Sequence, residues 1–251
     1  MLKKRIIPIL LYYNAWLVKT IQFNKRRNVG NLQQIINVFK DRKLDELVII
    51  DLYATSSNQN FNFNILDDVT QECNMPLIIG GGIKNLFDAE QAFKKGADKI
   101  IIGSAGYENV EFIRSIVENF GGQSLVFSID VKKENQKYSI FSKNGKKKID
   151  IPLKDWLTKI QDFGVGELLI TSIDKEGTMS GYDYGLLEEV EDCIRVPLIF
   201  NGGAGAQKDF TKILKNKKIM GACASSVFFF TEITPKSIKK NLKNKNIKLR
   251  S

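Results

Sequence analysis

Two segments typical of strands end in side chains of opposite character, and the difference bears directly on chemistry. Residues 125–130 end in Asp130, whereas residues 5–11 end in Leu11. The two segments lie about half a chain apart, at equivalent points of an internal repeat. Two carboxylates facing one cavity are a common means of acid–base catalysis on a single substrate. Because Leu11 stands where the second carboxylate is expected, such chemistry depends here on one acid or does not occur.

Glycines follow two further strand-like runs, at 80–82 and at 202–203, and the next run in each half ends in a small or hydroxyl residue. Consecutive glycines let backbone N–H groups approach an anion closely. A tight turn explains one such loop equally well, but two symmetric copies favour phosphate binding. We therefore predict two phosphate sites on opposite sides of one cavity, suited to an elongated bis-phosphorylated ligand. The residues concerned are Gly81, Gly82, Gly103, Ser104, Gly202, Gly203, Ala224 and Ser225.

Other polar residues fall at or near the carboxyl ends of the same runs. Taken singly, each is explained equally well as a loop or strand-end residue with ordinary hydrogen bonds. A lone Asp130 beside Leu11 can have a raised pKa and act as a single acid, or it can pair with Lys19 and be structural. The remaining candidates at this end are Asp51, Asp174, Glu176 and Gly177.

Four charges of alternating sign stand at the starts of the first, second, fourth and sixth runs. They could meet as a ring across the lower opening of a barrel. From their spacing alone, four ordinary charges in solvent are the better interpretation. The residues are Arg5, Glu46, Lys99 and Glu167.

The pattern of apolar runs indicates the element that positions these side chains. Short, continuous apolar runs alternate with amphipathic stretches, which is typical of a parallel sheet covered by helices. Eight such units in 251 residues predict one α/β domain over 1–251, a (β/α)8 TIM barrel. Residues 79–83 realign with 200–204, which indicates two half-barrel repeats, and Asn144-Gly145 predicts a β-hairpin inserted after the fifth strand. The runs are 5–11, 47–52, 76–80, 99–103, 124–130, 167–172, 197–200 and 219–224.

Composition excludes several classes of function. The chain has no histidine, which excludes Ser-His-Asp and Cys-His catalysis, and its three cysteines are too widely spaced for a metal knuckle, so we expect no metal and no cofactor. A formal net charge of +10 suggests acidic partners, but a solvated lysine-rich surface explains it more simply, and no basic–aromatic pattern indicates nucleic acid. No apolar run approaches about 18 residues, so we expect no membrane segment and a cytoplasmic location.

At this point the chain resembles the cyclase subunit of imidazole glycerol phosphate synthase, the HisF family. The resemblance extends from Lys4 to the C-terminus. In that family a glutaminase docks on the lower face of the barrel, and ammonia passes through the barrel to a bis-phosphorylated substrate. The motifs that carry the resemblance are 45–51, 76–83, 96–99, 166–172, 174–178, 181–183 and 201–205.

The resemblance assigns roles to individual residues. The family's ammonia gate matches the four lower charges residue by residue, and Asp98 matches a glutaminase-docking position. Lys19 matches a lysine on a mobile first loop, and Asp130 matches one of two catalytic aspartates. The departures are Leu11 for the second aspartate, Gly103 for a usual asparagine and Glu176 for a usual aspartate.

Three functions follow from this resemblance. In the first, the chain receives ammonia from a separate HisH-like glutaminase and passes it to a phosphorylated acceptor. Related paralogues imply amidination of a surface-glycan (lipopolysaccharide) sugar, with an ATP-dependent sugar amidotransferase as a third partner. In the second, the chain is an ordinary histidine-pathway cyclase that uses Asp130 and Lys19. In the third, it is a noncatalytic scaffold for its glutaminase, which the retained glycine loops argue against.

Overall fold

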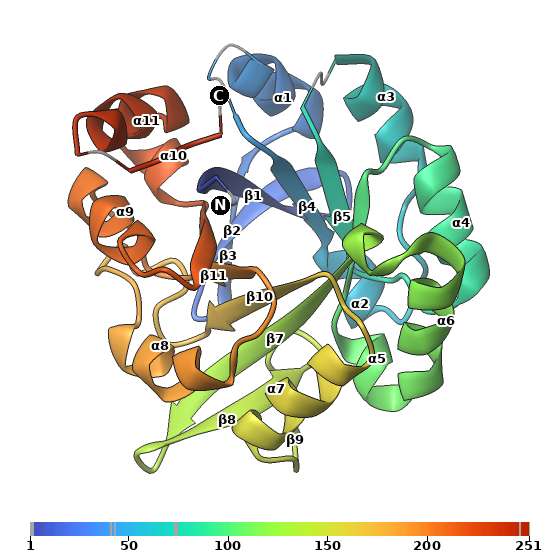
Figure 1. The fold of residues 1–251 in the computed structure, drawn as a ribbon. Coiled ribbons are helices and arrows are strands. Elements are labelled where there is room, and N and C mark those ends of the chain that lie inside the picture. The colour runs from blue at the N-terminus through green and yellow to red at the C-terminus, as the bar shows by residue number, and fades with distance from the viewer. Residues whose placement is uncertain (1–2, 41, 43, 73–74, 246, 251) are drawn as a thin grey trace.

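Eight of the twelve strands in the described residues form a closed ring of parallel strands (Figure 1). The computed structural model describes residues 3–40, 42, 44–72, 75–245 and 247–250. Neighbouring strands pair in chain order, and pairing of β7 with β10 closes the ring. The predicted (β/α)8 barrel is therefore confirmed. Its strands are β1 (Arg5–Tyr13), β4 (Leu47–Asp51), β5 (Leu77–Gly80), β6 (Lys99–Ile102), β7 (Leu125–Glu134), β10 (Glu167–Ser172), β11 (Leu198–Asn201) and β12 (Ile219–Ala224).

Helices surround the ring and cover its outer face (Figure 1). Asn85, Asn109 and Thr234 cap the N-termini of α4, α6 and α11 with their side chains, as short polar residues at such positions commonly do. The helices are α1 (Leu32–Lys40), α2 (Leu52–Ser56), α3 (Asn64–Glu72), α4 (Leu86–Lys94), α5 (Ser104–Glu108), α6 (Val110–Phe120), α7 (Leu153–Asp162), α8 (Tyr184–Val190), α9 (Gln207–Leu214), α10 (Val227–Phe230) and α11 (Pro235–Lys243), with 3-10 turns at Gly122–Ser124 and Glu191–Cys193.

Alternation along each strand divides the hydrophobic core into two clusters. In β1, Ile6 and Leu10 belong to the cluster between strands and helices, whereas Ile7, Ile9 and Leu11 belong to the cluster inside the barrel. Since successive side chains of a strand point to opposite faces, position along a strand decides which residues can face a cavity within the barrel.

The predicted hairpin after the fifth barrel strand is present. Strand β8 (Lys137–Ser142) pairs with the extended end of β7 and with β9 (Lys147–Ile149). Asn144 and Gly145 lie in the connection between β8 and β9, which spans residues 143–146 because Ser142 pairs with Lys147. Lys143, Asn144 and Gly145 all have positive φ.

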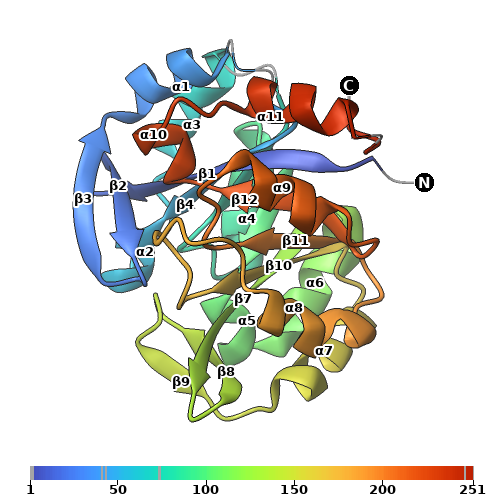
Figure 2. The same ribbon diagram turned by 90° about the vertical axis from the view of Figure 1, so that its left-hand side faces the viewer.

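A second hairpin, which the sequence analysis did not predict, follows β1. Strand β2 (Trp16–Ile21) pairs with β1 and with β3 (Lys25–Gly30). Asn14 and Ala15 form the first turn at positive φ. Both hairpins project on the side of the barrel away from the chain termini (Figure 2). They therefore stand at the carboxyl ends of the barrel strands.

Among the described helices, none combines the length and the apolar character needed to cross a membrane.

Candidate active site

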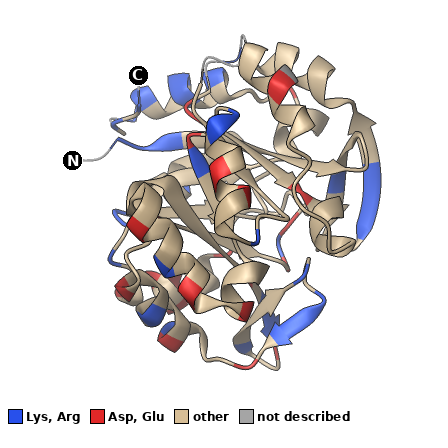
Figure 3. Ribbon diagram, turned by 90° about the vertical axis from the view of Figure 1, so that its right-hand side faces the viewer, with Lys and Arg blue, Asp and Glu red and all other residues tan. Residues whose placement is uncertain are grey.

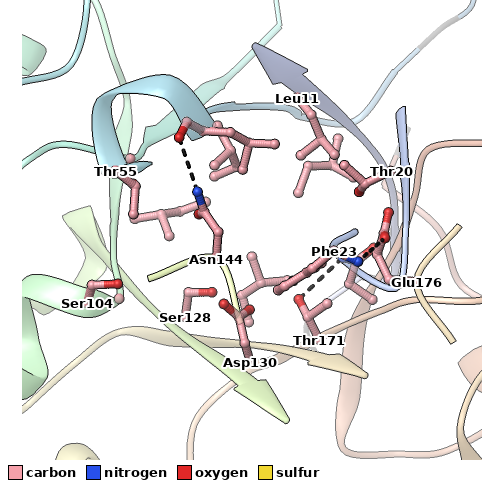
Figure 4. Close-up of a pocket in the computed structure, with 18 of the residues that line it drawn as sticks. Leu11, Thr20, Phe23, Thr55, Ser104, Ser128, Asp130, Asn144, Thr171 and Glu176 are labelled. Carbon is pink, nitrogen blue, oxygen red and sulfur yellow. Dashed lines mark hydrogen bonds between the residues drawn. The ribbon is translucent and has the colours of Figure 1, made fainter. Parts of the chain in front are cut away.

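A cavity of about 430 Å³ opens at the carboxyl ends of the barrel strands. Ile9, Ile50, Ile101 and Leu169 form its apolar base, and residues of both hairpins line its mouth. Polar side chains from several different strands and loops point into this space (Figure 4). In barrels of this type the loops at this end carry the chemistry, so the cavity is the candidate active site.

Asp130 and Leu11 face the cavity from opposite walls (Figure 4). Their strands, β7 and β1, are four places apart in the ring of eight. Removal from water, together with the negative charge of Glu176, raises the pKa of Asp130 to about 7. A carboxyl group with such a pKa exchanges a proton near neutral pH, as acid–base chemistry requires. Leu11 supplies only hydrocarbon to the wall on its side.

Glu176 places a second carboxylate at the cavity, on the loop after β10. It is buried, and its carboxylate accepts a hydrogen bond from the Phe23 backbone N–H at 3.2 Å. Burial raises the pKa of Glu176, although this hydrogen bond and the nearby Lys19 charge oppose the shift. The acidic pair of this cavity is therefore Asp130 with Glu176, on the same side of the barrel.

Four glycines shape two loops at opposite sides of the cavity. Gly81 and Gly82 follow β5 with φ of 86° and 82°, and Gly202 and Gly203 follow β11 with φ of 103° and 101°. All four line the cavity, as do Gly103 and Gly177. At Gly82 a Cβ would lie 2.6 Å from the Phe61 backbone nitrogen, so the close backbone packing also needs glycine.

We expect Gly203→Ala to destabilise the fold. Its φ of 101° disfavours any side chain, and the added Cβ would lie 2.1 Å from the Gly181 carbonyl oxygen. The strain corresponds to about 1–3 kcal/mol of unfolding free energy, measurable by denaturant titration. Gly103→Ala is the matched control, since nothing lies closer than 3.5 Å to its Cβ. Equal stability of the two variants would contradict this packing argument.

The serines predicted beside the glycine loops line the cavity, but both hydroxyls have protein partners. Ser104 Oγ accepts a 2.9 Å hydrogen bond from the Lys143 backbone N–H, so the β8–β9 connection reaches the first loop. Ser225 Oγ donates to the Ile9 carbonyl and accepts from Lys19 Nζ. Ala224, the small residue before Ser225, also lines the cavity.

Lys19 lies behind the cavity wall and is not among the described residues that line it. Its side chain is buried, with Nζ directed to Ser225 and 4.1 Å from the centre of the Phe229 ring. Burial lowers its pKa to about 7, and the charge of Glu176 partly offsets this. The resemblance places Lys19 on a mobile first loop. In the structure Lys19 lies within strand β2, and its neighbour Thr20 faces the cavity.

Asp51 and Asp174 were also predicted at the substrate end of the barrel, but neither is among the described residues that line the cavity. Asp51 is buried and accepts hydrogen bonds from Ala54 N at 2.9 Å and Asn62 N at 3.3 Å, which cap α2 and tie down the following loop. Asp174 accepts a 2.7 Å hydrogen bond from Lys133 N. These hydrogen bonds connect both aspartates to segments around the cavity, and their predicted contact with substrate stays a prediction.

Sequence analysis missed several polar residues of the cavity. Thr20, Ser128, Thr171 and Asn201 line it, and Asn201 Nδ2 donates to Thr171 Oγ1 at 3.3 Å. The signal was available in the period of the strands: Ser128 precedes Asp130 by two positions and so shares its face. The Thr20 hydroxyl is buried beside the Glu176 carboxylate.

At the opposite end of the barrel the four predicted charges lie together as a ring, here called the charged ring. Arg5 contacts Glu46 at 2.7 Å and also pairs with Glu167, while Lys99 contacts Glu167 at 3.1 Å and Glu46 at 3.5 Å. Both glutamates are buried. Burial alone would lower the pKa of Arg5, but the two carboxylates raise it. Arg5 therefore stays charged near neutral pH, held between the two buried glutamates.

Arg250 adds a fifth charge that sequence analysis missed. Its Nη1 lies 3.0 Å from Glu46 Oε1. Backbone hydrogen bonds between Lys4 and both Lys248 and Arg250, each 3.0 Å, hold the chain end beside β1. Outside the ring lies a depression of about 550 Å³, and inside it the barrel is apolar. Asp98 is exposed near this end and accepts a 2.8 Å hydrogen bond from Leu77 N.

The chain is a (β/α)8 barrel with an acidic, glycine-rimmed cavity at one end and a charged ring at the other. A cavity at the carboxyl ends of the strands is where enzymes of this fold carry their active sites. The profile of the family described as "Histidine biosynthesis protein" matches residues 5–234, and the chain belongs to this family. It is 39% identical to the imidazole glycerol phosphate synthase subunit HisF of Dictyoglomus thermophilum, over 100% of this chain and 99% of that protein. Identity to the HisF subunits of Natranaerobius thermophilus and Lactococcus lactis is 35% and 34%, over all of this chain and 100% and 97% of theirs.

Proposed function

We propose that this chain is the synthase subunit of a glutamine amidotransferase, which receives ammonia at the charged ring and delivers it to a phosphorylated acceptor in the cavity. The observation that carries the proposal is the contrast between the two ends of one barrel. The ring is complete and paired, whereas the β1 wall of the cavity carries Leu11 in place of a carboxylate. Ammonia delivery is thus retained while the acceptor chemistry differs from that of an ordinary HisF cyclase.

The ammonia comes from a separate HisH-like glutaminase. A chain without histidine cannot form the cysteine–histidine pair that activates a thiol, and its Cys223 is fully buried. The depression outside the charged ring, near the exposed Asp98, is the docking face in this proposal. The HisF relatives are named as subunits of a synthase, which agrees with a partner chain.

The interior of the barrel suits a neutral molecule such as ammonia. Between ring and cavity the inward side chains are apolar, including Val48, Ile78 and Val126. Burying an ammonium ion among them would cost far more than burying ammonia, because an unpaired charge loses its hydration. Ion pairs of the charged ring close the lower entrance, so in this proposal they part when ammonia enters.

At the acceptor end, Asp130 is the residue that moves the proton. Its pKa of about 7 lets it take a proton from the attacking ammonia or give one to a leaving group. The glycine loops hold the phosphates, and the apolar wall at Leu11 excludes the second acid–base step of a two-aspartate site. Amidination of a surface-glycan sugar, completed with an ATP-dependent sugar amidotransferase, is one reaction of this kind.

One observation favours a second candidate, an ordinary histidine-pathway cyclase. Glu176 gives the cavity a second carboxylate, and like Asp130 it has a raised pKa. In this alternative the pair Asp130–Glu176 replaces the two aspartates that face each other across the cavity. The two candidates therefore differ in whether Leu11 prevents cyclisation.

Turnover of the histidine-pathway bis-phosphorylated substrate, with saturating ammonium and no glutaminase, decides between them. We expect none from the wild-type chain and a gain of at least about tenfold over background from Leu11→Asp, because a positioned acid–base group contributes about 10²–10⁴ in rate. Product formation is followed in single-turnover and steady-state assays on folded protein that binds the substrate.

Leu11→Asn is the matched control, since it has the size of aspartate without the proton-transfer group, and we expect no gain. Wild-type turnover near that of an ordinary cyclase would overturn the proposal in favour of the second candidate. A folded Leu11→Asp variant without activity would instead shift the cause to the loop at 12–16.

A further inference from the structure

Arg26 brings an unpaired positive charge to the mouth of the cavity. It lies on β3 and lines the cavity, yet no described carboxylate forms an ion pair with it. Two lysines that line the cavity have partners: Lys143 contacts Glu108 at 2.8 Å, and Lys84 donates to the Asn58 carbonyl at 2.7 Å. Figure 3 shows the basic residues of this hairpin and of the β8–β9 hairpin on the same side of the barrel.

The Arg26 guanidinium lies over the ring of Tyr13, which a second aromatic ring supports. Its central carbon lies 3.9 Å from the centre of the Tyr13 ring, and Tyr13 packs edge-on against Tyr53 at 5.3 Å with an interplanar angle of 89°. A guanidinium stacked on a ring keeps its N–H edges free for hydrogen bonds. Since less side-chain freedom remains to be lost, an oxyanion would bind to it at a smaller entropic cost.

The order of strands places Arg26 relative to the phosphate loops. In the ring of eight, β5 and β6 carry one glycine loop and β11 and β12 the other, while β1 and β7 stand between them on opposite sides. The hairpin that bears Arg26 grows from β1. A ligand that spans both loops therefore passes the β1 side of the cavity, where Leu11 and the hairpin residue Arg26 line it, opposite Asp130.

We propose that Arg26 is a specificity-determining residue, which binds a carboxylate carried between the two phosphates of the acceptor. The planar fork of arginine matches a carboxylate with two parallel hydrogen bonds. A cation at the Leu11 wall reverses the charge preference that a second aspartate would impose there. This inference rests on the proposed function, because it assumes a ligand held at both glycine loops.

Two probes that differ only at C2 test the assignment by isothermal titration calorimetry. Arabinitol 1,5-bisphosphate has two terminal phosphates, and 2-carboxyarabinitol 1,5-bisphosphate adds a carboxylate on C2, between the two phosphates. We expect the wild-type chain to bind the carboxylated probe at least tenfold more tightly, and Arg26→Met to abolish that preference. Arg26→Lys keeps the charge without the fork and should retain only part of it.

Arg27→Met is the matched control. Arg27 is the neighbouring residue on β3, lies over the Phe230 ring at 5.3 Å, and is not among the described lining residues. Its loss changes the net charge equally and should leave the preference intact. Equal affinity of wild type for both probes, or an equal effect of the two substitutions, overturns the role of Arg26 alone. If neither probe binds, the two-phosphate site of the proposed function is refuted, and this inference with it.

Discussion

We expect Asp130→Asn to lower ammonium-driven turnover of the acceptor by about 10²–10⁴-fold. Asparagine keeps the shape of the side chain in the cavity but cannot exchange a proton. The expected loss is in kcat, because Asp130 acts at the reacting centre rather than at the phosphates. Turnover is measured with saturating ammonium and the phosphorylated acceptor that supports wild-type activity.

Asp130 and Lys19 both have a pKa of about 7, so a pH profile of the wild-type chain alone does not tell them apart. Comparison with the profile of Asp130→Asn does. If Asp130 accepts the proton, wild-type activity rises as the pH passes 7; if it donates the proton, activity falls. In either case the residual activity of Asp130→Asn lacks this limb. Asp150→Asn, an exposed position with the same charge change, should behave as wild type. A limb that persists in the Asp130 variant would assign it to Lys19.

Stability gives a second control on the same substitution. The pKa of Asp130 is raised in the folded chain, so its ionised form opposes folding, and this cost grows as the pH rises above its unfolded-state value. Asparagine removes the cost. The melting temperature of Asp130→Asn at pH 8 should therefore not fall, and an activity loss cannot be attributed to unfolding.

The barrel itself was predictable because its signal is repeated. Each barrel strand is a continuous apolar run, and eight runs separated by amphipathic stretches leave few alternatives. The β2–β3 hairpin gave no such signal. Its first turn, Asn14-Ala15, lacks the glycine that marks a short hairpin turn, and Lys25–Gly30 is polar and largely exposed.

Which residues reach the cavity was predictable only in part. Naming polar residues near strand ends takes no account of the face on which each side chain lies. Asp51 directly follows Ile50, which faces the cavity, so the strand period directs Asp51 away from it. On β2, likewise, Thr20 faces the cavity and the preceding residue, Lys19, points away from it. Arg250 reaches the charged ring only through tertiary contacts of the chain end, which no local pattern records.

The charged ring must serve both as a closure and as an entrance. Glu46 and Glu167 are buried, and each has several cationic partners, so loss of one cation leaves both glutamates paired. Lys99 is more exposed than Arg5, and it bridges the two glutamates. Removing it opens the ring without leaving an unpaired buried charge, which makes Lys99 the position for testing ammonia delivery.

We expect Lys99→Met to uncouple glutamine hydrolysis from conversion of the acceptor. With its glutaminase bound, we expect glutamine-driven turnover of the acceptor to fall about tenfold or more, while ammonium-driven turnover stays within about twofold, because ammonia supplied from solution reaches the cavity without the ring. The number of glutamines hydrolysed per acceptor converted should rise. Lys99→Arg restores a cation at this position and should recover part of the coupling, and Lys94→Met, an exposed lysine on α4, should match wild type. A Lys99→Met variant that remains folded, binds its glutaminase and keeps the wild-type ratio would refute ammonia passage through the charged ring.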